Sequence, residues 1–315
     1  MVRPDCQGRG EKELTTANMD KKILKKLEAL EKKEGALAGP LDFYRKLLSI
    51  QLDTKRHTGK PRFSLSPETI NERINAGRPL LEFDKLPVDW SLFEDTFKKI
   101  GALFASYSRD GAGTDWKQLS AGSSLKEAAR AWFEGAPPSF LMAESNANTT
   151  LWEHVIQAAF NPFLIAYRDS IYSQVNQEYW RRSYCPVCGG SPDFAFLDKE
   201  RGSRYLVCSR CDTEWIFQRL ACPFCGTQNQ SSLTYFSDDK GLYRLYVCDE
   251  CQCYLKAIDL RQTEDEILMP LERLLTLDLD IQAQEKGYKP VAKARDRVGA
   301  EEGREDQYKK ANINQ

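Results

Sequence analysis

The sequence predicts an α+β protein with a helical N-terminal domain, two tandem four-cysteine modules of short strands, and a C-terminal helix. Apolar residues recur at helical spacing over about residues 20–180. Nine of the ten cysteines lie between Cys185 and Cys253, and the segments around them are rich in residues that favour strands. A hydrophobic content of 41% over 315 residues is sufficient for one large or two ordinary domains.

The expected boundaries follow these shifts in composition. They are a flexible leader at 1–19, a helical domain at 20–180, a first module at 181–220, a second module at 221–261, a C-terminal helix at 262–288 and a disordered tail at 289–315.

Charge and hydropathy exclude several classes of protein. Lys and Arg total 45 against 46 Asp and Glu, so the chain has no long-range attraction for nucleic acid or anionic membrane. The polar N-terminal residues contain no apolar signal core, and no apolar run approaches the roughly 20 residues that span a bilayer. We therefore expect a cytoplasmic protein without membrane insertion, in a compartment where clustered cysteines are more often metal-binding or catalytic than bridged.

The helical domain has local signals of its own. Ser66 followed by Pro67 marks the start of a helix, with the serine as N-cap. Leu92, Phe93, Phe97, Ile100 and Phe104 form one apolar stripe, and Phe163, Tyr167, Ile171, Val175 and Tyr179 form another at four-residue spacing. Such stripes are typical of core packing. The domain contains no Ser/His/Asp grouping, Gly-rich phosphate loop or paired carboxylates, so no catalytic residue is predicted.

The cysteine segment contains an internal repeat. The first copy begins CPVCG and ends RYLVCSRCDTEWIFQRL, and the second begins CPFCG and ends YRLYVCDECQCYLKAIDL. Each copy is a C-x-x-C pair, a hairpin's length of chain and a second C-x-x-C pair. The eight cysteines are Cys185, Cys188, Cys208, Cys211, Cys222, Cys225, Cys248 and Cys251.

This spacing suits tetrahedral coordination by four thiolates. One tight turn presents two sulfurs to one ion, and Gly189 and Gly226 supply the backbone freedom after each turn. The hairpin brings the second turn round to face the first, as in a zinc ribbon or rubredoxin. We therefore expect two metal ions, iron or zinc, each held by the four cysteines of one copy. Crossed pairing between the copies is the alternative, and it needs longer loop closures.

The cysteines allow three other roles. Disulfide exchange by one pair is disfavoured, because a thioredoxin-like motif occurs once, between a strand and a helix. The metals can instead serve only to hold together a region too small for a good core. His57 and His154 are the only histidines and neither is near the pairs, so histidine ligands are not expected. Cys253 is either a half-buried strand residue or an alternate ligand, and Cys6 has no assigned role.

Nucleic-acid binding by the two modules is disfavoured by their charge. Residues 181–219 contain seven basic and five acidic residues, whereas residues 220–260 contain three basic and five acidic. The modules therefore lack the consistent basic face that nucleic-acid recognition needs.

The order of parts resembles the formate dehydrogenase accessory protein family, FdhE-like proteins. The likeness rests on the entry segment NQEYWRRSYCPVCGGSP, the two C-x-x-C repeats and the closing segment DEILMPLERLLTLDLDIQAQEKGY, over about residues 175–289. The family's paired cysteines match all eight positions named above. The resemblance implies rubredoxin-like iron sites and a cytoplasmic factor, not an enzyme, that contacts the catalytic subunit of formate dehydrogenase and is needed for its activity. A rubredoxin-type electron carrier and a zinc-ribbon regulator are the alternatives.

Overall fold

A computed structural model describes residues 16–32, 38–59, 61, 63–107, 123–136 and 149–290. The expected leader therefore lies outside the described residues up to residue 15, and the expected tail lies outside them from residue 291. The first helix begins at Thr16, slightly before the expected start of the helical domain. None of the described helices is both long and apolar enough to cross a bilayer.

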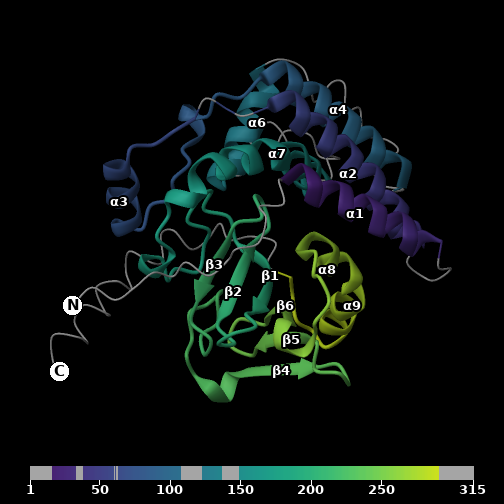
Figure 1. Cartoon of the computed structure of the whole chain (residues 1–315), viewed down its shortest axis with the longest axis vertical. Helices are drawn as coiled ribbons and strands as arrows, with labels where there is room; N and C mark the ends of the chain where they lie inside the picture. The colour runs from purple at the N-terminus through teal and green to yellow at the C-terminus, as the bar shows by residue number, and fades with distance from the viewer. Residues whose placement is uncertain are drawn as a thin grey trace.

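The N-terminal part is helical, as predicted. Its helices are α1 (Thr16–Glu31), α2 (Ala38–Thr58), α3 (Pro67–Asn75), α4 (Trp90–Tyr107), α6 (Ser123–Glu134) and α7 (Thr149–Ile171), with short 3₁₀ turns η1 (Phe83–Lys85), η2 (Tyr172–Gln174) and η3 (Gln177–Tyr179). Helix α2 packs against α1, α4 and α7. In Figure 1 these helices form an arch above the sheet.

The local signals in this domain are confirmed. The Ser66 side chain accepts a hydrogen bond from the Thr69 N–H at 3.2 Å, and Pro67 occupies the first turn of α3. Phe93, Phe97 and Ile100 of α4 are fully buried. Burial of a side chain of this size stabilises the fold by about 1.5–3 kcal/mol, so this stripe makes a large contribution to the helical core.

The second apolar stripe is shorter than expected. Phe163, Tyr167, Ile171 and Val175 are buried, but Tyr179 is 69% exposed. Helix α7 ends at Ile171, and the chain continues through η2 and η3. The prediction for Tyr179 was wrong because four-residue spacing keeps side chains on one face only while the α-helix lasts.

The cysteine segment forms one six-stranded sheet. Its strands are β1 (Pro192–Leu197), β2 (Arg204–Cys208), β3 (Glu214–Phe217), β4 (Leu233–Ser237), β5 (Tyr243–Cys248) and β6 (Cys253–Asp259), in the order β3-β2-β1-β6-β5-β4. Each repeat contributes three consecutive antiparallel strands, and we propose that these are the modules 181–220 and 221–261. The repeats meet where β1 pairs with β6 in parallel, from Phe194 opposite Lys256 to Leu197 opposite Asp259.

The two faces of this sheet have different neighbours. One face, here called the core face, presents Ala195, Leu206 and Trp215 to the main core that includes α4 and α7. On the opposite face, Val247 of β5 belongs to a cluster with Ala283 near the C-terminus. The sheet is therefore covered by the N-terminal helices on one side and by the C-terminal helices on the other (Figure 1).

The C-terminal helix of residues 262–288 is present as two short helices, α8 (Met269–Leu275) and α9 (Leu277–Glu285). They follow a 3₁₀ turn, η5 (Leu260–Gln262), and Pro270 lies in the first turn of α8. The buried Lys256 ammonium donates to the Asp280 carboxylate at 2.6 Å and to the Arg273 carbonyl at 2.9 Å. Lys256 therefore links both α8 and α9 to β6, and this contact stabilises the bend between the two helices at Thr276.

A buried ion cluster lies at the end of β6. The Asp259 carboxylate is fully buried and accepts hydrogen bonds from Arg244 at 2.5 Å and from Arg261 at 2.7 and 2.8 Å. Burial acts to raise the pKa of Asp259, but the bonds from Arg261 and the charge of Arg244 outweigh it and lower the pKa. This stabilisation is present above the unfolded-state pKa of about 3.9 and is lost as the pH falls through the lower folded-state pKa.

We predict that Asp259→Asn lowers the free energy of unfolding by about 3 kcal/mol, because it leaves two guanidinium groups without their shared carboxylate. Urea unfolding at neutral pH measures the effect, and Asp239→Asn, at an exposed aspartate on the β4–β5 turn, is the control. Equal midpoints for the two variants would contradict the prediction.

Candidate metal centres

The cysteines of the first repeat come together in one buried group. The sulfurs of Cys185, Cys188, Cys208 and Cys211 all lie within 4.8 Å of one another. Cys185 Sγ is 3.6 Å from Cys211 Sγ, and Cys188 Sγ is 3.5 Å from Cys208 Sγ. All four residues are buried, so this group is shielded from solvent.

The second repeat forms the equivalent group from Cys222, Cys225, Cys248 and Cys251. Cys222 Sγ is 3.7 Å from Cys251 Sγ, and Cys225 Sγ is 3.6 Å from Cys248 Sγ. Here Cys225 and Cys251 are only half-buried. Each group draws its four sulfurs from one repeat, so crossed pairing between the repeats is wrong.

The turns that carry these cysteines depend on left-handed backbone conformations. Gly189 and Gly226 have φ of +73° and +75°, which confirms the role expected of them. In the second turn of each repeat the same conformation falls on Asp212 and Gln252, both at φ +53° and both directly after a cysteine. Sequence reasoning missed these two positions, because neither residue is a glycine.

The distances fit a four-thiolate metal site and do not fit disulfides. A disulfide bond is about 2.05 Å long, far shorter than the separations of 3.5–3.7 Å found here. A tetrahedron with metal–sulfur bonds of about 2.3 Å has sulfur–sulfur edges of about 3.8 Å. Each group could therefore hold one metal ion, and these residues suit zinc or a single iron.

Backbone N–H groups point at the sulfurs within the turns. The Val187 N–H donates to Cys185 Sγ at 3.4 Å, the Arg210 N–H to Cys208 Sγ at 3.4 Å and the Phe224 N–H to Cys222 Sγ at 3.3 Å. Hydrogen bonds of this kind favour the negatively charged thiolate. The turns thus offer sulfur in the form that a metal ion binds.

Burial opposes this effect in the protein without metal. It raises the pKa of the Cys188 and Cys208 thiols well above the ordinary value, and it raises those of Cys225 and Cys248 to about 11. These four thiols are therefore protonated at neutral pH until a cation binds. Cys211 differs: burial acts to raise its pKa, but hydrogen bonds from the neighbouring cysteines outweigh burial and lower the pKa well below the ordinary value. Metal binding must release these protons, so protons compete with the metal as the pH falls.

Arginines surround the first group. Arg168 Nη1 donates to the carbonyls of Cys211 and Asp212, both at 3.0 Å. Arg273 Nη2 donates to the Cys208 carbonyl at 2.9 Å, and Arg273 Nη1 pairs with the Asp212 carboxylate at 2.5 Å. These positive charges offset the negative charge of a four-thiolate site. Arg168 and Arg273 are too distant from the cysteines in sequence for any motif to have revealed them.

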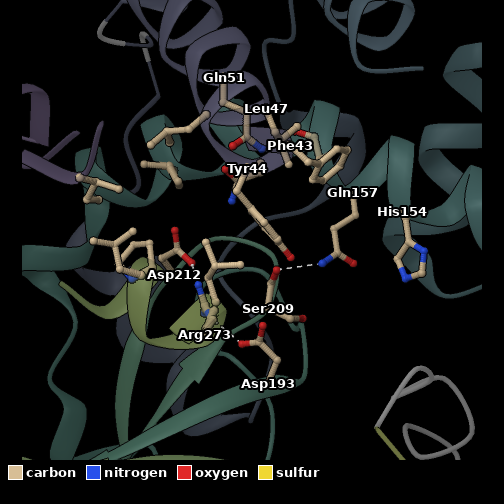
Figure 2. A pocket seen from close by; sticks show the side chains of 18 of the residues that line it. Phe43, Tyr44, Leu47, Gln51, His154, Gln157, Asp193, Ser209, Asp212 and Arg273 are labelled. Carbon is tan, nitrogen blue, oxygen red and sulfur yellow. Dashed lines mark hydrogen bonds and ion pairs between the residues drawn. The ribbon is translucent and has the colours of Figure 1, made fainter. Parts of the chain in front are cut away.

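The helical domain also contacts the first group through α7. Gln157 Nε2 donates to the Ser209 carbonyl and Asn161 Nδ2 to the Arg210 carbonyl, both at 3.0 Å. Figure 2 shows the contact of Gln157 with Ser209 at the edge of a cavity of about 580 Å³ between the helices and the sheet.

This cavity has a polar lining. Tyr44, His154, Asp193 and Arg273 all line it (Figure 2). Burial raises the pKa of Asp193, although Arg273 Nη2 lies 3.0 Å from its carboxylate. His154 does not belong to either sulfur group, and His57 is exposed on α2.

Cys253 lies beside the second group but is not one of its four cysteines. It is the first residue of β6, it is half-buried, and its Sγ donates to the Cys251 carbonyl at 3.3 Å. Its sulfur is not among the four that gather within 4.8 Å. The expected strand position is confirmed, whereas the assignment of Cys251 as the ligand stays a prediction.

Comparison with known proteins places this architecture. The model of a family described as "FdhE, central domain" matches residues 184–219, which span the first sulfur group. The "Protein FdhE homolog" of Aquifex aeolicus (strain VF5) is 30% identical over 230 residues, which cover 71% of this chain and 76% of the relative. The chain belongs to the FdhE family.

Other members of the FdhE family support the assignment. "Protein FdhE" of Escherichia coli O1:K1 / APEC is 27% identical over 226 residues, 70% of this chain and 69% of that protein. The crystal structure of the FdhE protein from Pseudomonas aeruginosa aligns with a TM-score of 0.61 over 88% of this chain and 92% of that chain, at 23% identity. This likeness shows that the two proteins share their fold.

We predict that the protein purified without oxygen contains two metal ions per chain, because two complete sulfur groups are present. Elemental analysis against protein concentration measures the ratio. Cys208→Ser should reduce it to one, since three sulfurs hold the ion more weakly. Folded wild-type protein with one equivalent or none would contradict the prediction.

We also predict that Cys251→Ser loosens or removes the second metal and makes its hairpin sensitive to protease, because ion binding contributes to folding there. Cys253→Ser is the matched control and should keep both ions. Metal content and limited proteolysis distinguish the two variants. The ligand assignment would be wrong if Cys253→Ser lost an ion while Cys251→Ser retained it.

Proposed function

We propose that this protein is a cytoplasmic accessory factor that is required for active formate dehydrogenase and binds its catalytic subunit. Membership of the FdhE family carries the proposal, together with the resemblance of residues 175–289 to formate dehydrogenase accessory proteins. We further propose that Cys185, Cys188, Cys208 and Cys211 hold one metal ion, and that Cys222, Cys225, Cys248 and Cys251 hold the other. The metal sites would shape a docking domain and would not carry out a reaction.

The coordination chemistry supports a binding role over an enzymatic one. A catalytic metal keeps one position open for water or substrate, whereas a structural site is closed by four protein ligands. Each group here supplies four sulfurs, and the first group is buried on all sides. A metal held in this way supplies folding energy to the sheet. The sheet then presents a fixed surface to the client.

A second candidate function rests on the difference between the two groups. Cys225 and Cys251 are half-buried, so iron bound by the second group would lie closer to solvent than iron in the first. A rubredoxin-type electron carrier needs such an approach for its partner. Reversible bleaching of an iron absorption band by a reductant would favour this function, and a colourless zinc protein would exclude it.

We predict that deletion of the gene lowers formate oxidation while the catalytic subunit is still made. The loss is expected because an accessory factor acts on the activity of its client and leaves its synthesis intact. Activity assays alongside immunodetection of the subunit measure both quantities. Complementation with the wild-type gene should restore activity, whereas Cys208→Ser should restore less. Full activity in the deletion strain, without any paralogue, would refute the proposal.

A further inference from the structure

A second cavity lies on the core face of the sheet, at the end formed by the second repeat. It has a volume of about 590 Å³ and includes Cys222 and Cys248 of the second sulfur group in its lining. Strand register places Leu233, Tyr246 and Leu255 on this same face, with Tyr246 opposite Leu255, and all three line the cavity. The cavity is therefore a hollow over β4, β5 and β6, beside the half-buried metal centre.

The charged groups in its lining have one sign. Among the described residues, Arg204, Arg219 and Arg244 line the cavity and no carboxylate does. Arg204 is 3% exposed and forms no ion pair within the described residues, and its Nε has no hydrogen-bond partner there. Three guanidinium groups with no carboxylate among them create a positive potential, so the cavity favours an anion.

This surplus of positive charge persists after the neighbouring groups are considered. The second sulfur group can balance Arg204, whose Nη2 donates to the Ala221 carbonyl beside Cys222. Arg219 is exposed and has no acidic partner among the described residues. Arg244 shares the single carboxylate of Asp259 with Arg261, and Arg244 Nε also lacks a partner. Among the described residues Arg219 thus has no competing carboxylate, and Arg244 offers its unpartnered Nε although its Nη2 pairs with Asp259.

The cavity adjoins an open strand edge. β4 is the outermost strand of the sheet, on the side away from the helical arch (Figure 1), and within the described residues no strand pairs with its outer edge. The Asp238 N–H bonds to the Tyr243 carbonyl at 3.2 Å, and the Asp249 N–H bonds to the Ser232 carbonyl at 2.9 Å. Because antiparallel pairs alternate, Leu233, Tyr235 and Ser237 direct their backbone groups outward.

The first repeat shows what such an edge can accept. β1 is the first strand of its repeat, as β4 is of the second, and the outer edge of β1 pairs in parallel with β6. The equivalent edge of β4 has no such strand among the described residues. Nearby, Leu220, Tyr235 and Phe236 are 62%, 50% and 44% exposed, and Leu220 and Tyr235 line the cavity itself.

We propose that the β4 edge and the arginine-lined cavity bind an extended acidic segment of a partner polypeptide. The segment adds to β4 as a seventh strand, through main-chain hydrogen bonds to Leu233, Tyr235 and Ser237. Alternate side chains then lie on the core face, where carboxylates pair with Arg219 and Arg244. This inference rests on the proposed function in one respect, namely that the polypeptide bound at this edge belongs to a client protein.

Single-stranded nucleic acid is the competing ligand, because exposed aromatic residues and arginines also bind bases and phosphates. One face of each exposed ring already carries a cation. The Arg244 guanidinium lies 4.9 Å from the centre of the Tyr235 ring, and Lys286 Nζ lies 4.8 Å from that of Phe236. The rings are thus less open to base stacking, whereas the strand edge is open to a polypeptide.

The charge test uses a fluorescein-labelled eight-residue peptide of alternating valine and glutamate, titrated with the full-length, metal-loaded protein and followed by anisotropy. The wild type should bind it, and the matching valine–lysine peptide should not bind. Arg219→Glu should weaken binding about tenfold or more, since it replaces an attraction by a repulsion. Arg201→Glu, at an exposed arginine on the β1–β2 turn, is the matched control and should bind as the wild type does.

The edge test compares Ser237→Pro with Ser237→Ala. Proline removes an outward N–H without breaking the β4–β5 ladder, so Ser237→Pro should weaken binding while Ser237→Ala should not. Metal content and the urea midpoint establish that each variant is folded. If Ser237→Pro does not fold, the edge is tested instead on the wild type with two N-methylated forms of the acidic peptide, one methylated at the odd and one at the even amides. The form whose methyl groups face β4 should fail to bind.

Three results would overturn the proposal. In the first, the lysine peptide binds as tightly as the acidic peptide. In the second, neither Arg219→Glu nor blocking of the β4 edge weakens binding of the acidic peptide. In the third, a labelled oligothymidylate binds more tightly than the acidic peptide and displaces it. The assay contains no formate dehydrogenase. It can therefore fail while the deletion experiment succeeds, and the two proposals are judged separately.

Discussion

Parallel pairing of β1 with β6 is the interaction on which the rest of the fold depends. Each repeat contributes only three short strands, which is close to the minimum for a stable sheet. The pairing joins them into one sheet with two broad faces. One face contributes to the main core with α4 and α7, and the other packs against the C-terminal helices. Without that join, neither set of helices would have a continuous surface to cover.

The same arrangement makes the two sulfur groups unequal. Helix α7 reaches the first group with Gln157, Asn161 and Arg168, which bond to the carbonyls of its second turn. The second group lies in the second repeat, which α7 does not reach in this way within the described part of the chain, and two of its four cysteines are half-buried. Two groups of the same composition therefore have different surroundings. The first ties the sheet to the helices, and the second lies beside the open part of the core face.

Local features of the structure could be predicted from the sequence, and long-range ones could not. The two-residue spacing, Gly189 and Gly226 were enough to predict which sulfurs meet, because each turn and hairpin closes over a short stretch. The β1–β6 pairing joins segments about 60 residues apart and has no sequence signal. The exposure of Tyr179 depends on where α7 ends, which a four-residue period cannot reveal.

The roles of the buried basic residues could not be predicted from the sequence for a similar reason. Arg273 reaches Cys208 and Asp212 from α8, more than 60 residues further along the chain. Lys256 looks like a solvent-facing strand residue in CYLKAID, yet it is buried against α8 and α9. Composition predicts lysine and arginine at the surface. Only the folded chain shows which of them bond to buried carbonyls and carboxylates.

The shared sheet has a consequence for how the protein comes apart. Lys256 and Ala257 of the second repeat pair with Phe194 and Ala195 of the first, so β6 cannot leave without exposing β1. The stabilities of the two repeats are therefore coupled through the sheet, even though each has its own sulfur group. An ion bound by the half-buried group would support its own hairpin and, through β6, the strand β1 of the first repeat. The stability of the more accessible centre would therefore affect that of the less accessible one.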